Sequence, residues 1–393
     1  MKNNWKVKRL SEVLKVQNGY AFNSKLFTNE TGTPLIRIRD LKNGLTTETK
    51  YRGDYDKRFE VKSGDFLIGM DGEFGCYEWK GDIALLNQRV CRLQDFQEAL
   101  FPRFLFYRIN GFLKAIEDVT GFTTVKHISS KQIEEIPIPL PPLSEQKYIV
   151  TILDEAFAAI TTAKENTETN KKNSRALFES CLQSIFANPG DGWEMKTLSE
   201  VTVEFGRGKS KHRPRGDPKL LGGKYPLIQT GDVANSDHWI TAYSQTYSEV
   251  GLAQSKLWPK GTVCIAIVGA NVAESAILDF NACFPDSVIG IVVNEKIADN
   301  EYVEFLLQSF KAFLKEKGKG TARDNINLGT FENQRFPFPN LQTQKDIVSK
   351  INSIVTETQR LDVIYQQKLS SLEELKKSLL QKAFSGDLRG MSL

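Results

Sequence analysis

The sequence has few of the residues that build metal sites or disulfide frameworks. Its three histidines, His127, His212 and His238, lie far apart, and no Cys-x-x-Cys pair accompanies them. A zinc site is therefore not expected. The five cysteines are scattered and odd in number, which argues against a disulfide framework and favours a reducing compartment.

Long apolar runs are also missing. No run reaches the roughly 18–20 apolar residues that a membrane span needs, and the first five residues lack the apolar core of a signal peptide. With 393 residues, 25% charged and 40% hydrophobic, the chain is long enough for two or three globular domains. We expect a cytoplasmic protein with no membrane contact. Its net charge of +4 is too small to indicate a nucleic-acid partner without a local concentration of charge.

Motifs of nucleotide-binding and methyl-transferring enzymes are absent as well. Gly208-Lys209-Ser210 resembles the end of a phosphate-binding P-loop, but Val203 stands where the motif needs its first glycine. No Gly-x-Gly-x-x-Gly follows a predicted strand, and neither Asn-Pro-Pro-Tyr nor Asp-Pro-Pro-Tyr occurs. The chain is therefore not expected to bind a nucleotide or to transfer a methyl group itself.

The chain does contain two proline-rich segments, each followed by a long stretch without proline or glycine. The first segment, residues 139–146, contains Ser144, which is a favourable helix N-cap. Residues 143–187 and 341–385 are predicted to be helices, and about 40 helical residues span about 60 Å.

The sequence also contains an internal repeat, with two copies of one pattern. Trp5 and the eight residues after it reappear from Trp193, and the segment at Ile136 reappears at Phe336. Six such matches occur in order, with an offset that drifts only from 188 residues (Trp5 to Trp193) to 200 residues (Ile136 to Phe336). We interpret the chain as a tandem duplication of a globular block followed by a long helix.

Each block has the pattern of a mixed α/β domain. Strands are expected at residues 33–38, 65–70 and 84–93, and helices at residues 102–119 and 301–316. Between the matched segments the two blocks diverge, as expected of two modules that bind different ligands on one scaffold.

The long helices carry apolar residues at helical spacing, so they need a partner. An antiparallel coiled coil of the two helices is the simplest arrangement; packing of each helix on its own block is the alternative. Residues 164–174 are nearly all polar, which leaves this part solvated, frayed or bound by another chain.

The combination of proline segment, Leu143-Ser144-Glu145-Gln146-Lys147, long helix and a second copy ending at residues 379–386 resembles the specificity subunit of type I restriction–modification systems. The resemblance covers essentially the whole chain. It implies α/β (α+β) target-recognition domains in tandem, related by a pseudo-twofold axis, with the long helices paired as an antiparallel coiled coil. The implied boundaries are 1–140 and 189–338 for the recognition domains, and 141–188 and 339–393 for the spacer helices.

The resemblance further implies a non-catalytic reader of double-stranded DNA. Each recognition domain reads one half of a split target, and the spacers dock two methyltransferase subunits, to which restriction subunits with translocase and nuclease activity are added. S-adenosylmethionine, Mg²⁺ and ATP are then expected on the partner subunits, with no cofactor in this chain.

Candidate DNA contacts come from basic, amide and hydroxyl side chains on divergent loops. The densest run is residues 207–215, on a loop broken by glycine and proline, and the glycine-led segments before the proline segments are shared by both blocks. The predicted DNA-binding residues are Asn18, Tyr20, Arg37, Arg39, Thr123, Thr124, Lys126, Arg207, Lys209, Lys211, Arg213, Arg215, Thr321, Arg323 and Asn325.

Two other functions remain open at this point. The long helices alone allow a coiled-coil adaptor that binds only proteins. Asp65 or Asp71 followed by Glu78-Trp79-Lys80 mimics the acid…Glu-x-Lys arrangement of a metal-dependent nuclease, although Thr262 occupies the place of Asp65 in the second block.

Overall fold

The computed structural model describes residues 5–120, 126–318, 326, 328–332 and 334–385. The chain forms two units, of which unit 1 comprises Met1–Asn166 and Lys368–Leu393 and unit 2 comprises Thr167–Gln367. In the described ranges, no helix combines the length and apolarity needed to cross a bilayer.

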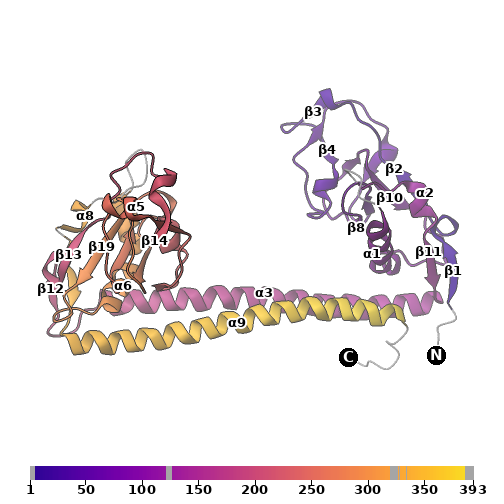
Figure 1. The fold of residues 1–393 in the computed structure, drawn as a ribbon. Helices are drawn as coiled ribbons and strands as arrows, with labels where there is room; N and C mark the ends of the chain where they lie inside the picture. Colours follow the sequence, from indigo (N-terminus) through magenta and orange to yellow (C-terminus); the bar gives the residue numbers. More distant parts are fainter. Residues whose placement is uncertain (1–4, 121–125, 319–325, 327, 333, 386–393) are drawn as a thin grey trace. The chain divides into compact units, whose positions relative to one another are not determined.

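Unit 1 contains a four-stranded antiparallel sheet in the order β2-β10-β7-β8 and a five-stranded sheet in the order β3-β5-β4-β9-β6 (Figure 1). A further pair of strands, β1 and β11, lies beside them. The strands are β1 (Lys6–Arg9), β2 (Lys15–Asn18), β3 (Phe27–Thr28), β4 (Thr33–Ile36), β5 (Lys50–Tyr51), β6 (Glu60–Val61), β7 (Phe66–Gly69), β8 (Gly75–Glu78), β9 (Ala84–Leu86), β10 (Val90–Gln94) and β11 (Pro137–Leu140).

Alternation along the central strand β7 separates two cores in unit 1. Phe66 and Ile68 pack in one core with helix α1 (Pro102–Val119), whereas Leu67 packs in the other with residues of the five-stranded sheet. The helix predicted at residues 102–119 is confirmed. The single strand predicted at residues 84–93 is wrong, because a turn at residues 87–89 divides it into β9 and β10.

Unit 2 is built around a five-stranded sheet in the order β13-β19-β17-β18-β15, with the ribbons β14-β16 and β12-β20 beside it (Figure 1). The helix predicted at residues 301–316 is divided in two at Phe310. The elements are β12 (Glu194–Lys196), β13 (Thr202–Arg207), β14 (Leu221–Leu227), α4 (Thr230–Ala234), β15 (Trp239–Ile240), β16 (Gln245–Tyr247), α5 (Glu249–Ala253), β17 (Val263–Ala266), β18 (Ser275–Leu278), β19 (Val288–Val293), α6 (Asn300–Ser309), α7 (Lys311–Gly318), α8 (Gly329–Glu332) and β20 (Phe336–Phe338).

The repeated sequence segments make the same contact in both units. β1 pairs antiparallel with β11, with Lys6 opposite Leu140, and β12 pairs antiparallel with β20, with Glu194 opposite Phe338. The start of each repeat therefore pairs with the proline-containing strand that leads into a long helix. Proline is tolerated there because each pair is a two-stranded ribbon with free edges.

A buried glutamine at the start of each long helix fixes the helix to its own block. In unit 1 the Gln146 side chain donates to the carbonyl oxygens of Ala99 (2.8 Å) and Pro141 (2.9 Å) and accepts from the N–H of Phe101 (2.8 Å). Gln146 is fully buried, so these bonds are shielded from water.

Gln344 makes the same three bonds in unit 2. Its side chain donates to the carbonyl oxygens of Ile297 (3.0 Å) and Pro339 (2.9 Å), and it accepts from the N–H of Asp299 (3.0 Å). Gln344 is also fully buried. The duplication thus extends to individual side-chain hydrogen bonds.

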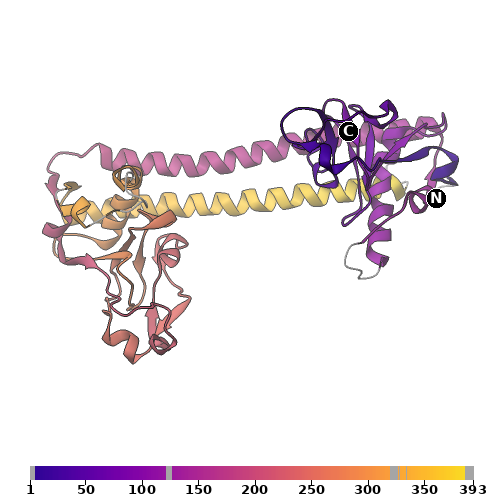
Figure 2. The ribbon, with the colours of Figure 1, turned by 90° about the horizontal axis from the view of Figure 1, so that it is seen from above.

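The two long helices are α3 (Leu143–Ala187) and α9 (Leu341–Ser385), and they run side by side in Figures 1 and 2. The α3 helix begins one residue before Ser144, so the prediction that Ser144 is its N-cap is wrong; the N–H groups of Glu145 and Gln146 bond instead to the carbonyl oxygen of Pro142.

Polar side chains join the two helices. In unit 2, Lys171 donates to Gln366 (3.3 Å) and Arg175 pairs with Asp362, so a step of four residues up α3 matches four residues down α9. In unit 1, Lys164 pairs with Glu373. The helices are therefore antiparallel, as predicted, and residues 164–174 are helical rather than frayed.

The apolar ends of the helices pack on the blocks. Leu153 and Ala383 belong to a core of unit 1, while Phe186 and Ile351 belong to a core of unit 2. Both interpretations of the apolar stripes are thus partly correct: their ends cover the blocks, and the polar middle of α3 contacts α9.

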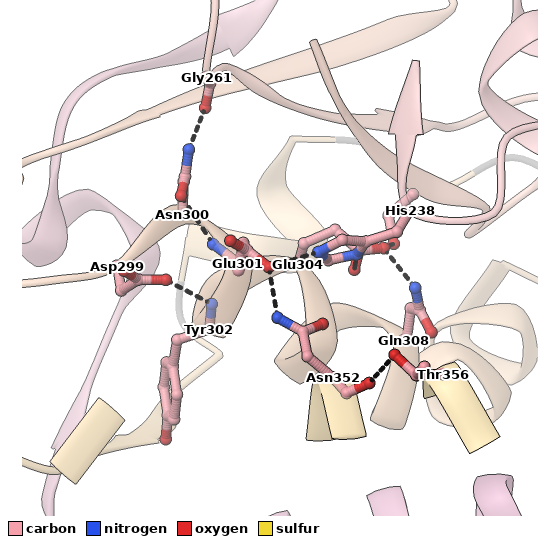
Figure 3. Close-up of polar contacts among 11 residues, drawn as sticks. His238, Gly261, Asp299, Asn300, Glu301, Tyr302, Glu304, Gln308, Asn352 and Thr356 are labelled. Carbon is pink, nitrogen blue, oxygen red and sulfur yellow. Dashed lines mark hydrogen bonds and ion pairs between the residues drawn. The ribbon is translucent and has the colours of Figure 1, made fainter. Parts of the chain in front are cut away.

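A largely covered histidine, with 12% of its side chain exposed, ties the sheet of unit 2 to α6 and α9 (Figure 3). His238 Nδ1 lies 2.7 Å from Glu304 and Nε2 lies 3.2 Å from Glu301, which also accepts from Asn352 of α9 at 2.9 Å. Burial lowers the pKa of His238, but the hydrogen bonds and negative charges of Glu304 and Glu301 together outweigh it, so the pKa lies above its ordinary value.

Replacing Gln344 by leucine is expected to lower the free energy of unfolding by about 2–3 kcal/mol, because buried backbone groups lose their partners. The exposed Gln342, two residues earlier on the same helix, provides the matched control, and Gln342→Leu should change it by less than about 0.5 kcal/mol. Urea denaturation of the full chain measures both. Equal losses would show that the buried amide bonds do not stabilise the fold.

The His238 contacts predict a pH dependence. Since the folded-state pKa is raised above the ordinary 6.5, the stabilisation is complete below about pH 6.5 and is lost as the pH rises through the folded-state pKa. Urea midpoints of the wild type should therefore fall above pH 6.5, and those of His238→Gln should lose this component. The exposed His212 serves as control, and His212→Gln should keep the wild-type dependence; a pH-independent wild type would contradict the assignment.

Candidate nucleic-acid interface

Four loops meet at one edge of the main sheet in each unit. The central strands are antiparallel, so the end of β2, the start of β10, the end of β7 and the start of β8 lie together, with Cys91 opposite Asn18 and Gly69 opposite both Val90 and Gly75. We call residues 18–20, 70–72, 87–89 and 126–128 the first loop edge. The second loop edge, in unit 2, consists of residues 207–215, 267–273, 285–287 and Ile326.

Backbone hydrogen bonds join the loops of the first loop edge. The N–H of Gly19 donates to the carbonyl oxygen of Val90, that of Met70 to Arg89, and that of Ile128 to Met70, each at 2.9 Å. The segment after residues 121–125 is thereby fixed beside the turn at residues 87–89.

The second loop edge repeats this pattern bond for bond. The N–H of Gly208 donates to Val288 (2.9 Å), that of Ile267 to Ser287 (3.0 Å), and that of Ile326 to Ile267 (3.0 Å). The Asn18–Tyr20 loop and the basic loop of residues 207–215 therefore occupy corresponding backbone positions in the two units.

A glycine is required where each loop leaves its strand. A Cβ on Gly19 would lie 2.0 Å from the carbonyl oxygen of Asn87, and one on Gly208 would lie 2.2 Å from that of Phe284. Both approaches are closer than any side chain allows, so these two positions keep the loops against the sheet while the residues that follow are free to vary.

Those predicted residues of unit 1 that the structure describes lie at or beside the first loop edge. Asn18 donates to the Ser130 hydroxyl (3.0 Å), and half of the Tyr20 surface is exposed. Arg37 and Arg39 follow β4. Its last residue, Ile36, pairs with Leu86, so the backbone of Arg37 lies beside the turn at residues 87–89.

Two of these cations have protein partners. Arg39 bonds to the Thr49 hydroxyl (3.3 Å), and Lys126 donates to the carbonyl oxygen of Glu117 (2.9 Å) at the end of α1. Their predicted DNA contacts stay predictions. Thr123, Thr124, Thr321, Arg323 and Asn325 lie outside the described residues.

The basic loop of unit 2 exposes all five predicted cations. Asp286 pairs with Arg215 and with Arg213, whose Nη2 lies 3.5 Å away. Within the described ranges, no acidic side chain pairs with the other three, which are Arg207, Lys209 and Lys211.

An acidic residue orients arginine at the first loop edge as well. Asp71 lies 3.6 Å from Nε of Arg89 and 2.6 Å from Nδ1 of His127. In unit 1 the arginine comes from the turn before β10, whereas in unit 2 the arginines come from the loop after β13. The two edges therefore share a kind of ion pair but not its residues.

Arg89 has a strained backbone, with φ of 72°. A left-handed conformation costs a non-glycine residue about 1–2 kcal/mol. Arg89 is not among the residues predicted from the sequence, and Asp71 was predicted only as a possible nuclease acid. The turn at residues 87–89 contains no glycine or proline that would mark it in the sequence. The only sequence feature that points to it is the duplication, in which it is equivalent to residues 285–287.

The acids of the nuclease hypothesis have separate partners. Asp65 pairs with Arg92 (3.0 Å) and Glu78 pairs with Arg103 (3.2 Å), while Asp71 binds His127. No group of three or more histidine, cysteine, aspartate or glutamate side chains in the described part of the chain is placed to hold a metal ion. The geometry therefore does not support the nuclease alternative.

A family described as "Type I restriction modification DNA specificity domain" matches residues 2–171 and 190–369. The chain belongs to this family. It is a DNA-specificity subunit and not itself an enzyme, which also removes the pure adaptor alternative.

Two known specificity subunits are similar over most of their length. The type I restriction enzyme EcoBI specificity subunit of Escherichia coli is 29% identical over 412 residues, covering 96% of this chain and 85% of that protein. The MjaVIII specificity subunit of Methanocaldococcus jannaschii is 23% identical over 381 residues, covering 92% and 87%.

Solved structures share the fold. One chain, from work on "complex assembly and conformational transition of the type I R-M system", has a TM-score of 0.74 at 20% identity and covers 99% of this specificity subunit and 100% of its own length. The HsdS subunit from Thermoanaerobacter tengcongensis has a TM-score of 0.60 at 20% identity, with 98% and 97% covered.

Removing the unpaired lysines of the second loop edge should weaken DNA binding mainly through its salt dependence. Each phosphate contact contributes about 0.9 to the slope of log K against log salt, so Lys209→Gln/Lys211→Gln should reduce that slope by about 2 if both contact phosphates. Fluorescence anisotropy with duplex DNA at several salt concentrations measures it. The control is Lys260→Gln/Lys296→Gln, at the opposite end of the strands; equal slopes for both variants would place the DNA elsewhere.

Proposed function

We propose that this specificity subunit reads a bipartite duplex target, with residues 1–140 reading one half-site and residues 189–338 reading the other. The observation that carries the proposal is the loop edge built twice with the same backbone bonds and different side chains. One scaffold that presents two sets of loops is suited to two different short sequences.

The long helices are proposed to set the distance between the half-sites. Two major-groove contacts one helical turn apart are separated by about 34–36 Å, and a 45-residue helix such as α3 rises about 68 Å. The helices therefore have ample length to bridge one turn of DNA.

The same helices are proposed to dock two methyltransferase subunits. Large apolar side chains stand exposed along them, including Leu177, Val363 and Leu375, and a partner that packs on the helices would cover this apolar surface. Restriction subunits with translocase and nuclease activity would join through the methyltransferases. S-adenosylmethionine, Mg²⁺ and ATP would be bound by these partner subunits.

The test is to map methylated adenines by long-read sequencing in cells that express the chain with its methyltransferase subunit. A split motif with two specified halves and a fixed unspecified gap is the expected result. An undivided motif from a well-assembled complex would rule out two separate readers.

Shortening both helices together should shorten the gap. Deleting residues 165–171 from α3 and 366–372 from α9 removes seven residues from each helix and leaves Lys164 opposite Glu373. Seven helical residues rise about 10.5 Å, so the gap should shrink by at most about three base pairs of 3.4 Å. The same mapping measures the gap.

The control deletes residues 165–171 from α3 alone, which breaks the match between the helices and should abolish methylation. If the paired deletion keeps methylation with an unchanged gap, the helices do not set the spacing.

A further inference from the structure

Arg89 lies at the centre of the first loop edge. Its carbonyl oxygen accepts the bond that fixes Met70, and its side chain is 56% exposed. Among the twelve residues that define this edge it is the only arginine. The other long cation there, Lys126, is engaged with Glu117, so Arg89 is the principal available cation of the edge.

The fold does not require an arginine in this turn. The corresponding turn of unit 2 makes the same closing bond, from Val288 to Pro285 (3.0 Å), as Val90 makes to Asn87 (3.2 Å). Ser287 occupies the place of Arg89, and it is not among the non-glycine residues with positive φ in the described ranges. A strained arginine where a relaxed residue serves the fold points to a functional role.

The surroundings of the guanidinium suit recognition of a base. Asp71 approaches Nε, and Nη1 lies 3.5 Å from Nδ1 of His127, a long contact. Within the described part of the chain, Nη2 has no hydrogen-bond partner. Two neighbouring donors on one guanidinium match the O6 and N7 acceptors of guanine in the major groove.

We propose that Arg89 determines specificity at the first loop edge by reading one guanine of a half-site, and that Asp71 is its positioning residue. This inference rests on the proposed function and names the base class that one edge recognises. Asp71 limits the directions available to the side chain before DNA arrives, and its own orientation is fixed by the 2.6 Å contact with His127.

The test compares methylation motifs of the full complex carrying wild-type chain, Arg89→Gly, Arg89→Lys or Asp71→Asn. Arg89→Gly removes the strained side chain, so the melting temperature should not fall. One guanine position in one half-site should become degenerate, with discrimination reduced about 5- to 150-fold, while the other half-site and the gap stay unchanged.

Arg89→Lys separates base reading from phosphate contact. Lysine keeps the positive charge but loses the planar pair of donors, so the same position should still relax. Asp71→Asn should relax that position to a smaller extent. The control is Arg9→Lys. Arg9 is an exposed arginine outside the first loop edge, and its Nη1 lies 2.8 Å from Glu135. The methylation motif of this variant should match that of the wild type.

A wild-type motif from Arg89→Gly, or from Arg89→Lys, would overturn the assignment, and so would loss of specificity in both halves. These results leave the proposed function standing, because the wild-type complex reports on it separately. A wild-type complex that gives no split motif would remove both the proposed function and this inference.

Discussion

The three hydrogen bonds of a buried glutamine determine how each block is held on its long helix. Gln146 and Gln344 each connect the first turn of a helix to the segment before α1 or α6. Hydrogen bonds lose strength steeply when their geometry changes, and inside a dry contact no water replaces them. A block therefore cannot slide along the start of its helix without losing several bonds at once. The position of each block on its long helix, and with it the position of the block's loop edge, therefore depends on these side-chain amides.

The two loop edges have the same backbone arrangement but carry different side chains. The backbone bonds of Gly19 and Gly208 and the closing bonds of the turns before β10 and β19 are the same in both units. The side chains differ: one edge presents a single arginine oriented by Asp71, whereas the other presents a run of cations partly paired with Asp286. The backbone positions the loops, and the loop residues are left to specify the ligand.

Local signals in the sequence predicted much of this architecture. Proline segments and stretches without glycine mark the long helices. The internal matches predict one fold built twice, and the equivalent strand pairs β1-β11 and β12-β20 agree with that prediction. The break between β9 and β10 was missed, since Asn87, Gln88 and Arg89 carry no glycine or proline. Arg89 and Asp71 are 18 residues apart in the sequence (89 − 71) and come together only through tertiary pairing, and no pattern in a single sequence encodes that approach.

The division of the chain also affects the order in which it can fold. Unit 2 is one continuous stretch, Thr167–Gln367, inserted between the two parts of unit 1. Ala383 is fully buried in unit 1, and Phe384 packs edge-on against Phe104 at 5.5 Å. During synthesis the inserted unit can close as soon as it leaves the ribosome, but the earlier-made unit must wait for the last helix. A chain interrupted after unit 2 would contain a folded unit 2 and a unit 1 whose apolar surface is left uncovered by the end of α9. Such exposed apolar surface is a natural target for quality-control proteases.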